Sequence, residues 1–259
     1  MSIVEPVRDE RAAIDKAFSL LVAFGDHTSS GLGVSELARR AKLSKSTAFR
    51  ILGILERNGI VERVGTNYRL GPRLNDLGRA VYSPRNDRLR DLLLPYLTEL
   101  FGATRNTVHL AVLHGDDVVY LAKLYGHRTV VAPSRIGGRL PANCTAVGKA
   151  LLAYDPEAAA AAMATPLAHL TPRSIADPAT LAAELARIRR EGVAWDQEES
   201  RMGVHCVAAP VLSRTGRPIA ALSVSAPLST DLGPLTKPLR RVCAAAAQAL
   251  TLSGLGRTA

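Results

Sequence analysis

The chain has 259 residues, 47% of them hydrophobic, a formal net charge of +10 and an isoelectric point near 10.0. This length suits two domains of ordinary size, and the basic balance favours a polyanionic partner such as nucleic acid. The sequence lacks a run of about 18 apolar residues, a secretory signal and a C-x-x-C pair, so we expect a cytoplasmic protein without a membrane span, a disulfide framework or a zinc finger.

The first predicted element is a helix over about residues 9–24. Its apolar residues at helical spacing predict a buried stripe of Ile14, Ala17, Phe18 and Leu21. Residues 26–33 read DHTSSGLG, a composition typical of a loop.

Residues 34–50, VSELARRAKLSKSTAFR, have the pattern of a helix-turn-helix. Ser35 is predicted to cap a first helix that buries Leu37, Ala38 and Ala41, and a tight turn follows at residues 42–43. Ser44 is predicted to cap a second helix. The buried stripe expected on this second helix is Ala48, Ile51, Leu52 and Leu55.

The outward face of the second helix suits a DNA major groove, because short polar donors at its start precede an arginine one turn later. The predicted base-reading and phosphate-contacting residues on this helix are Ser44, Lys45, Ser46, Thr47, Phe49 and Arg50. The alternative is an ordinary capped two-helix turn with a solvated charged face.

A hairpin is predicted next, with residues 60–61 and 68–70 as strands around the turn 65–67. A hairpin directly after such a helix is a wing, and Arg63, Thr66, Asn67 and Arg69 would meet phosphate or a minor groove. Residues 39–73 contain nine basic and two acidic side chains, an excess that phosphate contacts would use. A basic RNA-binding segment has a similar excess but less often this order of elements.

A further helix is predicted from Pro72 to about residue 82, and the SPRNDR stretch at 83–88 is the expected domain boundary. We therefore divide the chain into residues 1–83, a winged helix-turn-helix domain, and residues 84–259. Residues 89–101 have a helical period on both sides of Pro95, where we expect a break or a helix start.

The second domain is predicted to be α+β, with helices packed on a mainly antiparallel sheet. The expected strands are 107–114, 117–124, 129–132, 204–212 and 217–226. The expected helices are 143–154, 158–164, 178–191 and 235–252.

No catalytic motif is present, and the six histidines form no close helical pair, so we expect no catalytic residue, metal or cofactor. Adjacent Glu198 and Glu199 would point to opposite faces of a strand, so solvated charge explains them better than acid–base chemistry. Cys206 lies in an apolar strand. We interpret it as a buried small side chain or as a cavity-lining thiol, and a catalytic nucleophile is the least favoured alternative. The alternating Ser223 and Ser225 need polar partners, which favours a small-molecule pocket.

Several segments together resemble the IclR family of bacterial transcriptional regulators over nearly the whole chain. They are LSKSTAFRILGILERNGIVER, YRLGPRLNDLG, RIGGRLPANCTAVGKALLA and LARIRREGVAWDQEESRMGVHCVAAPVLSRTGRPIAALSVSAP. The resemblance implies a winged helix, a linker helix used in dimerisation and a GAF-like effector domain. It further implies a regulator, expected to be a repressor, that binds a palindromic operator as a dimer or dimer of dimers and responds to a small organic acid.

Family effector contacts, carried onto this sequence, imply a seven-residue effector site. Those residues are Ala146, Val147, Asp196, Val204, Cys206, Ser223 and Ser225. The sequence departs from the family at Asn143 and Cys144, where His and Ala or Thr are common. The alternatives are a regulator whose second domain only oligomerises and an enzyme-like thiol site fused to a DNA-binding module.

Overall fold

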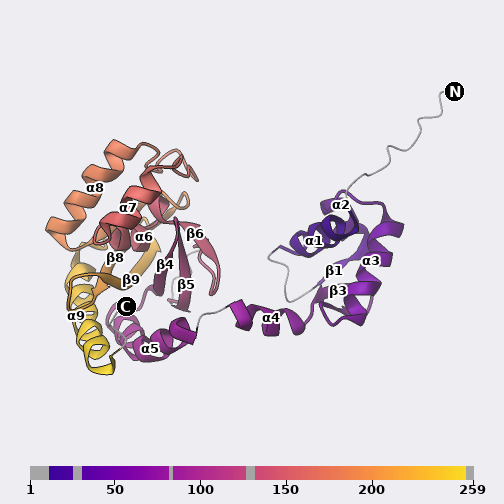
Figure 1. Cartoon of the computed structure of the whole chain (residues 1–259), viewed down its shortest axis with the longest axis horizontal. Helices are drawn as coiled ribbons and strands as arrows, with labels where there is room; N and C mark the ends of the chain where they lie inside the picture. Colours follow the sequence, from indigo (N-terminus) through magenta and orange to yellow (C-terminus); the bar gives the residue numbers. More distant parts are fainter. Residues whose placement is uncertain (1–11, 26–30, 82–83, 127–131, 255–259) are drawn as a thin grey trace. The chain divides into compact units, whose positions relative to one another are not determined.

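The computed structural model describes residues 12–25, 31–81, 84–126 and 132–254. The chain divides into two compact units, Met1–Ser83 and Pro84–Ala259 (Figure 1).

The first unit packs three helices, α1 (Ala13–Ala23), α2 (Val34–Arg40) and α3 (Lys45–Arg57), around one apolar core. The fourth helix, α4 (Arg73–Val81), directly follows Pro72. On α1 the prediction of the buried stripe was partly wrong, because Leu20 and Phe24 fill the core whereas Ile14 and Phe18 are 69% and 63% exposed. This helix is apolar on almost every side, so its periodicity did not select the face that meets α2 and α3.

The helix-turn-helix forms where the sequence predicts it. Leu37, Ala38 and Ala41 are buried on the first helix and its turn, and Ser44 caps α3. The prediction that Ser35 caps α2 was wrong, because α2 begins at Val34 and its N-cap is Gly33, which has no side chain to donate or accept.

The hairpin after α3 consists of β2 (Val61–Val64) and β3 (Asn67–Leu70), with Val64 opposite Asn67 across a tight turn. A third short strand, β1 (Leu32–Gly33), pairs with β3 in a segment that the sequence predicted as loop. Two residues are too few for a period-2 pattern, so this strand had no sequence signal.

The second unit contains a six-stranded, wholly antiparallel sheet in the order β6-β5-β4-β9-β8-β7. Its strands are β4 (Thr107–His114), β5 (Asp117–Leu124), β6 (Arg139–Pro141), β7 (Ala194–Gln197), β8 (Val204–Leu212) and β9 (Pro218–Pro227). The expected strands include neither β6 nor β7, and residues 129–131 of the expected strand 129–132 lie outside the described residues.

Helices cover both faces of this sheet (Figure 1). The core on one face includes α5 (Pro84–Thr104) and α9 (Thr236–Ser253), which contact each other. The core on the other face includes α6 (Ala146–Leu152), α7 (Pro156–Met163) and α8 (Pro178–Glu191). A short 3-10 helix, Ala142–Cys144, precedes α6.

Two predictions about the region of helix α5 were wrong. The helix runs without a break through Pro95, and it begins at Pro84 inside the stretch that the sequence predicted to interrupt the chain. Pro95 lies on the exposed face, where water can satisfy the carbonyl that loses its hydrogen bond, while Leu93 and Leu97 on the buried face are fully covered. Pro84 suits the first helical turn because a proline there loses no intrahelical bond.

Candidate nucleic-acid interface and ligand pocket

The start of α3 is held by a local hydrogen-bond cluster around Ser44. Its Oγ accepts from the backbone nitrogen of Thr47 at 3.2 Å and donates to the Thr47 hydroxyl at 2.9 Å, and Ser46 Oγ lies 3.1 Å away. The cap fixes the first turn of the helix and keeps these hydroxyls at its exposed end.

The outer face of α3 carries the side chains that the sequence selected. Lys45, Ser46 and Arg50 are exposed, and Thr47 is half-buried at the edge. Phe49 is 54% exposed although it lies beside fully buried Ala48. An exposed aromatic ring on this face suits apolar contact with a thymine methyl group, and Arg50 suits a guanine edge.

The two arginines of the wing, Arg63 and Arg69, differ in exposure and in pairing. Arg63 is exposed, donates to the Gly65 carbonyl at 3.2 Å and lies over the Tyr68 ring, while Thr66 is exposed at the tip. Arg69 is paired with Glu62, its direct neighbour across the two strands. Arg69 therefore brings less net charge to a phosphate than Arg63 does, a difference that only the strand register determines.

In the second unit, the seven residues that the resemblance selected lie around one small cavity of about 20 Å³. Further residues around it are His109, Tyr120, Ala132, Pro133, Ser134, Leu140, Thr145 and Ser200. Two rows across the sheet bring four of the seven together. One row aligns Asp196, Cys206 and Ser225, and the next aligns Ser223, His109 and Lys123.

Asp196, the next-to-last residue of β7, lies at the cavity and holds the turn that follows the strand. Its Oδ1 accepts from the backbone nitrogens of Glu199 at 2.7 Å and Ser200 at 3.3 Å, and its Oδ2 accepts from the Ser200 hydroxyl at 2.6 Å. Burial raises the pKa of this carboxyl, while these hydrogen bonds act in the opposite direction.

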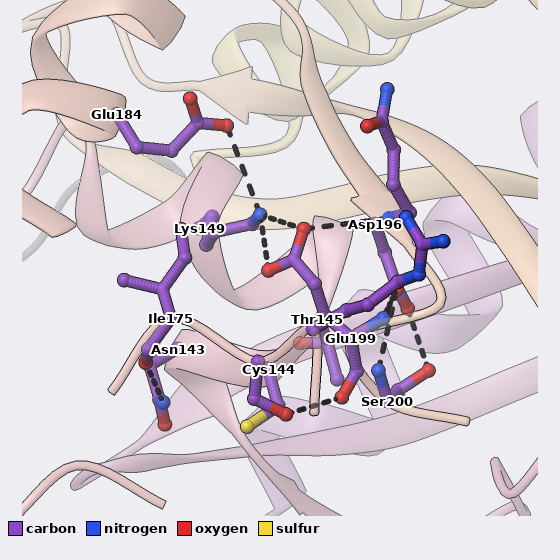
Figure 2. A network of polar contacts seen from close by, with 12 residues as sticks. Asn143, Cys144, Thr145, Lys149, Ile175, Glu184, Asp196, Glu199 and Ser200 are labelled. Carbon is purple, nitrogen blue, oxygen red and sulfur yellow. Dashed lines mark hydrogen bonds and ion pairs between the residues drawn. The ribbon is translucent and has the colours of Figure 1, made fainter. Parts of the chain in front are cut away.

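Glu199 of this turn forms a buried ion pair with Lys149. Lys149 Nζ, from α6, donates to both carboxylate oxygens of Glu199 at 2.5 and 2.6 Å, and Glu184 of α8 lies 3.7 Å away (Figure 2). The prediction that Glu198 and Glu199 are solvated was wrong, since they are 9% and 6% exposed. Their charges are compensated by tertiary partners, Lys149 for Glu199 and Arg173 for Glu198.

Both units of the chain match models of known protein families. Residues 13–65 match the IclR helix-turn-helix domain, and residues 85–251 match the family model described as bacterial transcriptional regulator IclR C-terminal. The chain belongs to the IclR family. It is a DNA-binding transcriptional regulator with an N-terminal helix-turn-helix domain and an α+β C-terminal domain.

Individual IclR-family proteins match along most of their length. The HTH-type transcriptional regulator XynR of Escherichia coli (strain K12) is 36% identical over 217 residues, covering 82% of this chain and 85% of that protein. The acetate operon repressor of Salmonella typhimurium is 28% identical over 258 residues, covering 96% and 92%. The crystal structure of an IclR homolog from Microbacterium hydrocarbonoxydans complexed with 4-hydroxybenzoate has a TM-score of 0.72 and 31% identity, covering 92% and 99%.

Cys206 of this IclR-family chain is a cavity-lining thiol. Its Sγ lies 2.8 Å from Ser225 Oγ, and burial, reinforced by the charge of Asp196, raises the pKa of the thiol. A thiol held protonated is a weak nucleophile, so this environment does not favour the enzyme-like alternative.

The departure from the family at Asn143 lies away from the cavity lining. The side-chain amide of Asn143 donates to the Ile175 carbonyl at 3.0 Å (Figure 2). It also donates to the Ala168 carbonyl at 2.8 Å, which Cys144 Sγ contacts as well. These residues hold the segment between α7 and α8 rather than line the cavity.

Sequence reasoning missed His109 as a cavity residue. It is 2% exposed, its Nδ1 lies 3.2 Å from Ser223 Oγ, and its Nε2 lies 2.8 Å from Ser134 Oγ. A polar residue inside the apolar strand TVHLAVLH was the available signal, but only the pairing of β4 with β9 places it beside Ser223.

No helix in the described ranges is long and apolar enough to cross a bilayer. Among the residues that the structure describes, no group of three or more His, Cys, Asp or Glu side chains is arranged to hold a metal ion.

Proposed function

We propose that this regulator represses metabolic or catabolic genes by binding a palindromic operator, and that a small organic acid in the cavity controls the binding. The observation that carries the effector half is the convergence of Asp196, Cys206, Ser223 and Ser225, from three strands, on one cavity. The named functions of the two relatives, acetate operon repression and 4-hydroxybenzoate binding, support repression and an acid effector.

The DNA half of the proposal rests on α3 and the wing. Phosphate neutralisation by the basic residues of 39–73 gives sequence-independent affinity, and the exposed start of α3 discriminates bases. One such helix reads one half-site, so useful recognition requires at least a homodimer on a palindrome. We assign the dimer contact to the linker helix α5, and we propose that the effector changes the spacing of two recognition helices.

The size of the cavity bears on the effector. About 20 Å³ suffices for one water-sized molecule, whereas an organic acid requires more. Acid binding therefore includes displacement of side chains in the wall, which gives the ligand a means to favour one conformation over another.

A thermal-shift screen of the full chain against organic acids tests this function, because a ligand that binds the native state raises its melting temperature. Hits are then added to gel-shift assays on duplexes selected from a random pool with the same protein. We expect an acid to raise the melting temperature and to change the affinity for selected DNA.

The pocket assignment is tested by the double variant Ser223→Ala with Ser225→Ala. We expect it to lose the acid response while binding selected DNA as tightly as the wild type. Wild-type acid affinity, measured by calorimetry, would disprove the assignment. If no acid stabilises the wild type but sizing shows a dimer that binds selected DNA, the second unit serves oligomerisation alone.

A further inference from the structure

A chain of four buried polar side chains runs from β5 to the cavity. Lys123 Nζ donates to the Ser134 carbonyl at 2.9 Å and to the Ser134 hydroxyl at 3.2 Å. Ser134 Oγ lies 2.8 Å from His109 Nε2, and His109 Nδ1 lies 3.2 Å from Ser223 Oγ. All four residues are less than 9% exposed, so bulk water does not compete for these hydrogen bonds.

The donor Lys123 and the need to satisfy every buried donor together give one order of hydrogen bonds in this chain. An ammonium group only donates, so the Ser134 oxygen accepts from it and has one hydrogen left to give. Buried at this site, that hydrogen needs an acceptor, and His109 Nε2 lies within reach at 2.8 Å. The order that satisfies every donor therefore has Nε2 as the unprotonated nitrogen of a neutral imidazole. The remaining ring hydrogen is on Nδ1 and points to Ser223 Oγ, whose own hydrogen stays available.

The histidine is suited to this role because it carries no charge at neutral pH. Burial and the positive charge of Lys123 lower the pKa of His109 to about 3. Protonated His109 would donate from both nitrogens and would oppose the Ser134 hydrogen, so the neutral form is required for the order described.

We propose that Lys123, Ser134 and His109 are specificity-determining residues, which fix Ser223 as a hydrogen-bond donor to the cavity so that this wall accepts a carboxylate or carbonyl oxygen and rejects an N–H group. The inference rests on the proposed function, in which the cavity binds an effector. Among the described residues, His109 is the side chain that bonds Ser223, while the neighbouring Ser225 lies 3.5 Å from Nδ1 and closer to Cys206.

Rejection of donors follows from the cost of an unmade hydrogen bond. A ligand N–H can bond only to the second lone pair of Ser223 Oγ, which leaves the Ser223 hydrogen without an acceptor on the ligand, and an unsatisfied buried donor is costly. A ligand oxygen at the same place is satisfied, and the nearby Lys123 charge adds to its attraction if the oxygen is anionic.

The first test needs no ligand. In the full chain labelled with ¹⁵N-histidine, long-range ¹H–¹⁵N correlation spectra report the tautomer of each ring, and His109→Gln identifies the His109 signals by their loss. We expect a neutral ring protonated on Nδ1. A ring protonated on Nε2, or an imidazolium at pH 7, overturns the inference whatever ligands the protein binds.

The second test compares carboxylic acids with their primary amides, including 4-hydroxybenzoate and 4-hydroxybenzamide, in thermal shift and calorimetry. We expect the wild type to prefer acids at least tenfold. Ser134→Ala frees the His109 tautomer without changing any charge, so it should reduce that preference to threefold or less. Ser213→Ala is the matched control, a buried serine in the β8–β9 turn outside the cavity lining, and should keep the wild-type preference.

The outcomes separate this inference from the proposed function. Acid binding with equal or better amide binding, or an unchanged preference in Ser134→Ala, overturns the inference while the effector function stands. If no acid or amide binds although His109 is protonated on Nδ1, the effector function and the specificity role both fail, and the chain of hydrogen bonds is structural.

Discussion

Lys149 Nζ lies 2.5 Å from Glu199 Oε1, and the two side chains are 1% and 8% exposed. The pair links α6 to the turn that follows β7, and the same turn presents Asp196 and Ser200 to the cavity. A buried pair of this kind holds two elements in one arrangement, and removal of one partner leaves the other charge without compensation.

We therefore expect Lys149→Met to lower the free energy of unfolding by about 3–5 kcal/mol. The double variant Lys149→Met with Glu199→Leu should recover part of that loss, because no buried charge is left alone. Urea unfolding followed by tryptophan fluorescence measures both, since the single tryptophan of the chain, Trp195, lies in β7 of the affected unit.

The exposed pair Arg241–Glu99, with atoms 3.1 Å apart, provides the matched control. Arg241→Met should change the same unfolding free energy by less than about 1 kcal/mol, since solvent screens an exposed pair. An equal loss in Arg241→Met and Lys149→Met would contradict the role given to burial.

The low pKa of His109 predicts a pH dependence of stability. The pKa of His109 is about 3 in the folded protein, against an ordinary value of 6.5. Below pH 6.5 the unfolded chain therefore binds a proton that the folded chain does not. This contribution to stability is complete above pH 6.5 and is lost as the pH falls toward 3. Between pH 7 and pH 5 the wild type should lose about 2 kcal/mol more than His109→Gln. Urea unfolding at each pH measures the free energy of unfolding of both proteins. If it changes with pH by the same amount in both, the histidine is accessible to protons in the folded protein.

Gly148 is predicted to be intolerant of any side chain. An added Cβ would lie 2.2 Å from the Ala142 carbonyl oxygen and 2.4 Å from its Cα, so α6 and the preceding 3-10 helix would have to separate. We expect Gly148→Ala to destabilise the protein by about 1–3 kcal/mol and to weaken acid binding, since Ala146 and Val147 line the cavity.

The control for Gly148 is Gly102, an exposed glycine in α5 where an added Cβ meets nothing within 4 Å. Gly102→Ala should stabilise the protein by about 0.5–1 kcal/mol, because alanine loses less conformational entropy in a helix. Thermal unfolding of the two variants compares them directly, and destabilisation by both would point to a general effect rather than to the contact with Ala142.

Arg50 is predicted to read a base. If it contacts a guanine edge, Arg50→Ala should weaken binding to selected DNA by about 1–3 kcal/mol and relax the preference at one position. Arg190→Ala, which removes an exposed positive charge from α8 in the other unit, should bind as the wild type does. Gel-shift titration at fixed salt measures both, and equal affinities for wild type and Arg50→Ala exclude the base-reading role.

The sequence by itself determined the elements whose signals are local. Ser44 and Asp177 cap helices because their side-chain oxygens reach amides three residues away, and the β4–β5 hairpin follows from two strand patterns around Gly115 and Asp116. The resemblance selected seven residues that the structure brings around one cavity. These inferences depend on residues a few positions apart in the sequence or on family motifs that are present in full.

The tertiary structure decided whatever depends on partners distant in the chain. Glu199 is buried because Lys149, 50 residues earlier, compensates its charge, and Arg69 is neutralised because the register places it opposite Glu62. His109 meets Ser223 across 114 residues. A local pattern reports the hydrophobicity and spacing of neighbours, whereas desolvation, ion pairing and hydrogen-bond direction depend on which side chains the fold brings within a few ångströms.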